Sequence, residues 1–207
     1  MRHFPCYDIH EFKIFEGLDS PAKVQDFLDT LSINFEPAGG TCHSPLRTLE
    51  NKTAHCLEGA LLAAAIFWYH GERPLLLDLE TTFKDSSHVV ALFKRNGRWG
   101  AVSKTNHAVL RYREPVYKNI RELAMSYFHE YFLDNGKKTF RRYSTKPLDL
   151  QEFEDNWLTA KHNLWGIEDE LINAPHENIL SKESEKHLRR ADPIKIRAGK
   201  FTEWKKR

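Results

Sequence analysis

The two residues of this 207-residue chain that are best suited to chemistry are Cys56 and His88. Cys56 lies within KTAHCLEGALLAAAIFWYHG, residues 52–71, directly before a long run of small and apolar residues. A run that is apolar on nearly every side predicts a buried helix, and Gly71 suits the left-handed conformation found after helix ends. Because a helix N-terminus stabilises negative charge through unpaired N–H groups and the helix dipole, Cys56 is a candidate nucleophile.

A catalytic thiol needs a base that is reached through space, and His88 is the best-placed histidine for this role. It follows the sequence KDSS and opens HVVALF, which is predicted to form a β-strand. His88 is therefore expected at the beginning of a strand, where the start of a helix packed on the sheet can meet it. A plainer interpretation stays open, in which Cys56 is an inert buried thiol and His88 bonds only a backbone carbonyl.

The elements that must position these residues follow from periodicity and turn signals. Helical spacing predicts helices over 20–31, 56–71, 119–134 and, as one or two segments, 150–171. Short β runs predict strands over 73–80, 88–95, 98–103, 107–112 and, less distinctly, 137–144. Asn96 and Gly97 predict a tight hairpin turn. A central helix that begins at Cys56, an antiparallel sheet and additional C-terminal helices together indicate an α+β fold.

The cysteine and histidine segments together resemble a known family. A cysteine opens an Ala-rich core helix, a short strand follows, and in HVVALFKRNGRW the residue Trp99 comes eleven positions after His88. This pattern, which covers about residues 45–110, is similar to the transglutaminase-like superfamily of papain-like thiol enzymes. The resemblance implies a Cys, His and Asp triad for acyl transfer or for amide and peptide hydrolysis, with Cys56 as nucleophile, His88 as base and no cofactor.

The third member of the implied triad departs from that family's pattern. Where family members usually have Asp, this chain has Ser103, in GAVSKTNH. Asn106 could orient the imidazole through its amide oxygen, as asparagine does in papain-like proteases, and Ser103 could do so less strongly. Without a carboxylate the imidazolium loses stabilisation. The alternative to a thiol enzyme is therefore a non-catalytic module of the same fold that binds a protein or peptide partner.

Other polar residues near Cys56 receive secondary roles. Glu58 and His107 are candidate substrate contacts, although capping of the helix or a salt bridge is the favoured role for Glu58. His55 points about 100° away from Cys56 around a helix and is expected to face solvent or cap rather than to act as a second base. We expect no metal site, since the six cysteines and histidines that invite one lack the CxxC or HxxxH separations of paired ligands: Cys42, His43, His55, Cys56, His88 and His107.

The composition limits the number of domains and the compartment that we expect for this protein. With 41% hydrophobic residues, the chain can bury a core of its own. We expect one domain over 1–175, with a core at about 20–150, and a basic extension over 176–207. Three cysteines, no signal-like N-terminus and no apolar run of membrane-spanning length favour a cytoplasmic protein.

The extension is the most basic part of the chain. Residues 181–207 carry ten Lys and Arg against four Asp and Glu, whereas the formal net charge of the whole chain is +2. Phe201 and Trp204 could stack on a nucleobase there. Because the sequence has no RRM, KH or helix-turn-helix signature, nucleic acid is the less favoured partner and a protein or peptide substrate is expected.

Overall fold

The structure is a computed structural model that describes residues 2–205. Its strands are β1 (Ser32–Ile33), β2 (Thr53–Ala54), β3 (Leu75–Thr81), β4 (His88–Arg95), β5 (Arg98–Val102), β6 (Arg113–Tyr117), β7 (Phe140–Ser144), β8 (Leu148–Asp149) and β9 (His176–Asn178). Its α-helices are α1 (Pro21–Thr30), α2 (Pro45–Asn51), α3 (Cys56–Tyr69), α4 (Ile120–Ser126), α5 (Trp165–Asn173), α6 (Lys182–Lys186) and α7 (Pro193–Gly199). Short 3-10 helices span His10–Gly17, Leu150–Glu152 and Asp155–Leu158.

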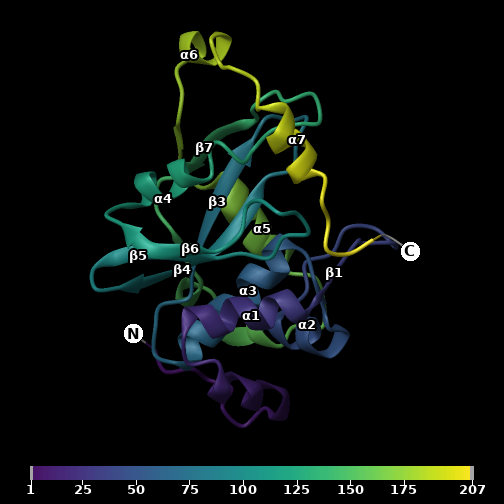
Figure 1. Cartoon of the computed structure of the whole chain (residues 1–207). Coiled ribbons are helices and arrows are strands. Elements are labelled where there is room, and N and C mark those ends of the chain that lie inside the picture. The colour runs from purple at the N-terminus through teal and green to yellow at the C-terminus, as the bar shows by residue number, and fades with distance from the viewer. Residues whose placement is uncertain (1, 206–207) are drawn as a thin grey trace.

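One antiparallel sheet organises the molecule, in the strand order β6-β5-β4-β3-β7-β9, with β8 also paired to β3 (Figure 1). Its two faces line separate cores because side chains alternate along each strand. Leu76 and Val89 belong to the core that contains α3, whereas Leu77 and Val90 belong to the core under α4. The α+β class expected from the sequence is confirmed.

The central helix α3 carries Cys56 as its first residue. Residues 60–66 have no exposed surface, and the helix packs against β4, α1 and α2. Gly71 lies just beyond its end with a φ of 80°, the conformation expected from the sequence. A helix that is enclosed in this way holds its N-terminus at a fixed place relative to the sheet.

Local signals that depend on neighbouring residues appear in the structure as expected. The Ser20 side chain accepts a hydrogen bond from the backbone N–H of Lys23, and Pro21 occupies the first turn of α1. Asn96 and Gly97 join β4 to β5 with φ values of 49° and 75°. Both residues therefore adopt the positive φ that a tight hairpin turn of the primed type requires.

Other element boundaries differ from the sequence-based predictions. The predicted strand over 107–112 is an irregular loop, and Leu110 within it has a φ of 61°, which no strand residue adopts. The helix predicted over 119–134 ends at Ser126, and the apolar residues after it reach the core from turns. Two 3-10 helices and α5 replace the helices expected over 150–171, and α2 was not expected. Apolar spacing predicted burial correctly here, but tertiary packing chose the backbone conformation.

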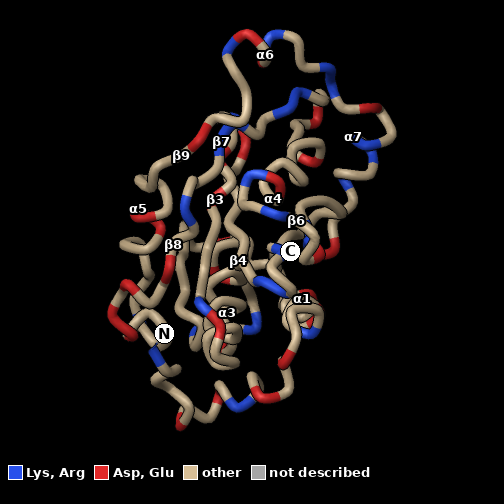
Figure 2. The backbone as a smooth tube through the Cα atoms, turned by 90° about the vertical axis from the view of Figure 1, so that its left-hand side faces the viewer, with Lys and Arg blue, Asp and Glu red and all other residues tan. Residues whose placement is uncertain are grey.

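The predicted boundary after residue 175 does not interrupt the sheet. β9 pairs with β7, and Ile179 beyond it is buried in the core under α4. The basic segment then continues through α6 and α7 (Figure 2) and returns to the loop at 106–107, where Glu203 N–H donates to the carbonyl of Asn106. Residues 206–207 of the predicted extension lie outside the described residues. Among the described helices, none is long and apolar enough to cross a bilayer.

Candidate active site

Cys56 lies where α3 meets the end of the sheet, and the residue is partly exposed. Burial by itself would raise the pKa of the Cys56 thiol. Hydrogen bonds from His55 and His88, together with the positive charge on these rings, outweigh burial and hold the pKa of Cys56 well below that of a free thiol. The helix N-terminus favours the thiolate further. The expected proximity of Cys56 and His88 is present in the structure.

His88 begins β4, lines the same hollow as Cys56, and its ring bonds a hydroxyl. Its Nε2 lies 2.6 Å from Oγ of Ser103, and that Oγ lies 2.6 Å from the carbonyl oxygen of Leu110. A carbonyl oxygen only accepts, so the Ser103 hydroxyl donates to Leu110 and accepts from Nε2–H of His88. This arrangement leaves Nδ1 as the nitrogen that can exchange a proton with Cys56.

Ser103 is the residue that occupies the third position of the site. It is fully buried just after β5, and the side chain of Gln25 on α1 holds its backbone at both ends. Gln25 Oε1 accepts from the N–H of Ser103 at 2.9 Å, and Gln25 Nε2 donates to its carbonyl at 2.9 Å. Ser103 thus bonds the ring of His88. This reverses the predicted order of preference, in which Asn106 came first as the residue that orients the imidazole.

Asn106 is committed to the C-terminal segment. Its amide oxygen accepts from the N–H of Trp204 at 2.8 Å, and its amide nitrogen donates to the carbonyl of Trp204 at 3.0 Å. An amide oxygen used in this way does not orient His88. His107 is exposed, and its Nδ1 lies 3.0 Å from the carbonyl oxygen of Gly199, so it remains a candidate substrate contact at the rim of the site.

His55 lies closer to the thiol than the sequence suggested. It is the N-cap of α3: Nδ1 accepts from the N–H of Leu57 at 3.2 Å and Nε2 lies 2.8 Å from the carbonyl oxygen of Thr41. The cap was expected, but the effect on the thiol was not. Burial favours the neutral ring, yet Cys56 and Glu58 outweigh it and raise the pKa of His55 to about 9. In the protonated ring Nδ1 carries a hydrogen and cannot accept from Leu57, so the cap requires the neutral ring.

Glu58 is buried beneath the site, which excludes the contact with substrate that was considered for it. Its side chain has no exposed surface and completes a capping box with the N–H of His55 at 3.1 Å. It also accepts from the Asn34 amide at 3.0 Å and the Thr41 hydroxyl at 2.9 Å. Burial would raise the pKa of Glu58, but the charge of His55 and these hydrogen bonds lower it below its usual value. The carboxylate therefore fixes the loop over 34–43 against the start of α3.

Lys104 was not predicted as part of the site, and it is fully buried next to Ser103. Its Nζ donates to the carbonyl oxygens of Leu28 and Leu31, at the C-terminal end of α1. Gly59 on α3 permits this arrangement, since a Cβ there would lie 2.4 Å from Cβ of Lys104. The small-residue side of the helix thus allows α3, α1 and the end of β5 to meet behind the thiol.

The other two cysteines have properties unlike those of Cys56. Burial raises the pKa of Cys42 to about 12, and its Sγ lies 3.6 Å from the carbonyl oxygen of Leu164. Burial and nearby carboxylates also raise the pKa of Cys6. Both remain thiols at neutral pH, so the chain contains its own reference thiols for any measurement on Cys56.

Two hollows meet at Cys56 and His55. One has a volume of about 580 Å³ and is lined by His88, the loop over 104–110 and parts of α7. The other has a volume of about 460 Å³ and lies between the loop at 36–41 and α5. A thiol between two hollows can accept an extended chain that approaches on both sides.

Comparison with protein-family models finds no match to this sequence, and a search of curated proteins finds none either.

Proposed function

We propose that the protein is a transglutaminase-like thiol enzyme that transfers or hydrolyses an acyl group. The single observation that supports this proposal best is a partly exposed cysteine at a helix N-terminus, in a hollow that the imidazole rings of His55 and His88 also line. Such an arrangement costs burial energy and gives an inert thiol no benefit. Perturbed ionisation in a cleft is typical of catalytic groups.

The reaction would proceed in two halves. The Cys56 thiolate attacks the carbonyl carbon of an amide and forms a C–S bond, and the backbone N–H at the start of α3 can donate to the developing oxyanion. Protonated His88 gives its proton to the leaving amine as the C–N bond breaks. Neutral His88 then takes a proton from water or from a second amine, which attacks the thioester and releases Cys56.

The charge around the site favours a basic peptide as substrate. Each hollow is lined by three carboxylate residues, which are Asp85, Glu130 and Asp134 in one and Glu36, Asp78 and Glu168 in the other. Among the described residues that line them, Lys104 is the one Lys or Arg, and its Nζ is bonded to backbone carbonyls. We expect peptides with Lys or Arg beside the reacting amide to be used at least about tenfold better than acidic ones, because charge complementarity raises encounter and affinity.

A non-catalytic, peptide-binding module is the second candidate, and the serine at position 103 favours it. A carboxylate stabilises an imidazolium through its charge, whereas a hydroxyl offers only a hydrogen bond. The same cleft with a poorly activated base would bind a peptide without turning it over.

Alkylation of the three cysteines as a function of pH separates these candidates. Iodoacetamide labelling followed by peptide mapping gives the rates for Cys56, Cys6 and Cys42 in one sample. At pH 6 we expect Cys56 to react at least about tenfold faster than Cys6, because only the thiolate reacts. His88→Ala should remove most of this advantage, while Asn135→Ala, in an exposed turn, should not. A Cys56 rate that follows an ordinary thiol pKa above about 8 would rule out the enzyme.

A further inference from the structure

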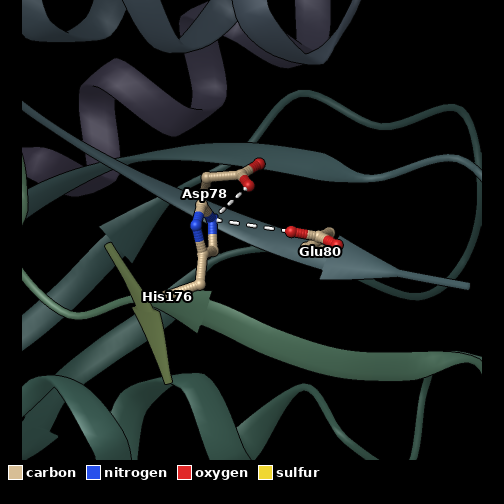
Figure 3. Close-up of side chains that lie close together, drawn as sticks. All are labelled: Asp78, Glu80 and His176. Atoms are coloured by element: carbon tan, nitrogen blue, oxygen red, sulfur yellow. Dashed lines mark hydrogen bonds and ion pairs between the residues drawn. The ribbon is translucent and has the colours of Figure 1, made fainter. Parts of the chain in front are cut away.

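A second cluster of chemical groups lies on β3, and one of its members, Asp78, also lines the hollow between α5 and the loop at 36–41. Asp78 and Glu80 are two residues apart on one strand, so their side chains share a face of the sheet. His176 comes from β9 and reaches across to them (Figure 3). One ligand atom from each of the three residues lies within 4.8 Å of the other two.

The hydrogen bonds of His176 show which of its ring nitrogens carries a hydrogen and which one faces the carboxylates. Nδ1 lies 2.6 Å from the carbonyl oxygen of Ala174 and so carries a hydrogen, since a carbonyl only accepts. Nε2 lies 2.9 Å from Oδ2 of Asp78 and 3.9 Å from Oε2 of Glu80. A neutral ring would point its Nε2 lone pair at these carboxylate oxygens. The position between them therefore calls for a cation, which is either a second proton or a metal ion.

We propose that Asp78, Glu80 and His176 form a binding site for a divalent first-row metal ion of the Mn²⁺ or Zn²⁺ type. One imidazole and two carboxylates, with no thiolate, are ligands suited to such ions. The bond from Nδ1 to Ala174 fixes the ring with Nε2 directed at the site, as the outer hydrogen bond of a metal-bound histidine does. The proposal does not depend on the reaction at Cys56.

Arg142 is the neighbour that the site must accommodate. Its Nε lies 2.6 Å from Oε2 of Glu80. This is also the Glu80 oxygen nearest to Nε2 of His176, so the carboxylate must turn about its last bond to give Oε1 to the ion while Oε2 stays with Arg142. Ligand carboxylates commonly keep such an outer hydrogen bond.

Burial distinguishes this cluster from an ordinary surface ion pair. The side chains of His176 and Asp78 are 2% and 8% exposed, whereas Glu80 is 28% exposed and gives the ion a route from solvent. The pair of His187 and Glu183 on α6 offers a contrast, with side chains 75% and 70% exposed. A bound ion would tie β9 to β3 across the intervening β7 and so hold the C-terminal region to the sheet.

The test uses Mn²⁺, because thiolates such as that of Cys56 compete poorly for this hard ion. Electron paramagnetic resonance of the chelator-treated full chain counts bound Mn²⁺ as free signal is lost. We expect one ion per chain, with affinity lowered at least about tenfold in Asp78→Asn and in His176→Gln, since each removes a ligand. Glu183→Gln, which alters the exposed pair, should bind as the unaltered chain does.

Thermal unfolding with and without Mn²⁺ gives a second readout that holds even if a variant is less stable. A ligand bound only by the folded state raises the melting temperature. The unaltered chain should shift upward and His176→Gln should not. Absence of binding at about millimolar Mn²⁺, or equal affinity and equal shifts in His176→Gln, would show that His176 bonds Asp78 through a proton alone and would overturn the proposal.

Discussion

The two sides of Cys56 are built differently. On one side lies His88, which lowers the pKa of the thiol and is supported by the hydroxyl of Ser103. On the other side lies His55, which also lowers this pKa and lies 3.5 Å from the fully buried carboxylate of Glu58. The carboxylate that is absent behind the proposed base is thus present behind the helix cap. His88 is therefore placed to move protons, while His55 and Glu58 are placed to supply charge.

The largest effect is expected from Glu58→Gln. The amide would face the Asn34 and Thr41 donors with one fewer acceptor, and removal of a buried charged partner costs about 3–5 kcal/mol of unfolding free energy. Urea unfolding measures this loss, and Glu152→Gln, in the surface turn after β8, serves as the control. A loss below about 1 kcal/mol would mean that the carboxylate does not hold the loop.

The same variant tests the pH dependence of stability. The pKa of Glu58 is lowered in the folded state from an ordinary value of 4.5, despite burial, by His55 and its hydrogen-bond donors. As pH falls below about 4.5 the unfolded chain takes up this proton first, so stability falls with falling pH. Glu58→Gln should flatten this decline between about pH 5 and pH 3. Equal slopes in the two proteins would contradict the assignment.

His55→Asn isolates the contribution of charge from that of the cap. Asparagine is a good N-cap, so the start of α3 is retained while the imidazole is removed. We expect alkylation of Cys56 at pH 6 to slow severalfold, because loss of the imidazole charge raises the pKa of the thiol and lowers its thiolate fraction. His55→Ala should slow it similarly and also lower the melting temperature. An unchanged rate in His55→Asn would assign all activation to His88.

Ser103→Ala should have a smaller effect. The loss of one hydrogen bond to the ring corresponds to about 0.5–1.5 kcal/mol, or about two- to tenfold in the alkylation rate. Ser103→Asp adds the carboxylate that is usual at this position in the transglutaminase-like superfamily. Faster alkylation of Cys56 in this variant would support the role proposed for Ser103 in orienting His88. No change in either variant would remove Ser103 from the site.

Asn106→Ala should leave the alkylation rate of Cys56 within about twofold, because its amide bonds Trp204 and not His88. The variant should instead loosen the C-terminal segment, which limited proteolysis between residues 193 and 205 would detect. Slower alkylation without faster proteolysis would return Asn106 to the role first considered for it.

The sequence predicted the parts of the site that depend on local signals. Cys56 at a helix start, Gly71 after its end, and the turn at Asn96 and Gly97 each follow from residue type and spacing. It did not identify Gln25, whose one signal was a polar residue on the buried face of α1. It also could not choose Ser103 over Asn106, because the backbone turn at Leu110 and the returning C-terminal segment decide this choice through contacts distant in sequence.

The most direct test is the thiolate titration of Cys56, measured as the ultraviolet absorbance difference between the unaltered chain and Cys56→Ser. Because both imidazole rings lower the pKa of this thiol, we predict a transition well below that of an ordinary cysteine, with the difference already present at pH 6. A transition only at about pH 8.5 or above would contradict the account, because Cys56 would then be an ordinary thiol.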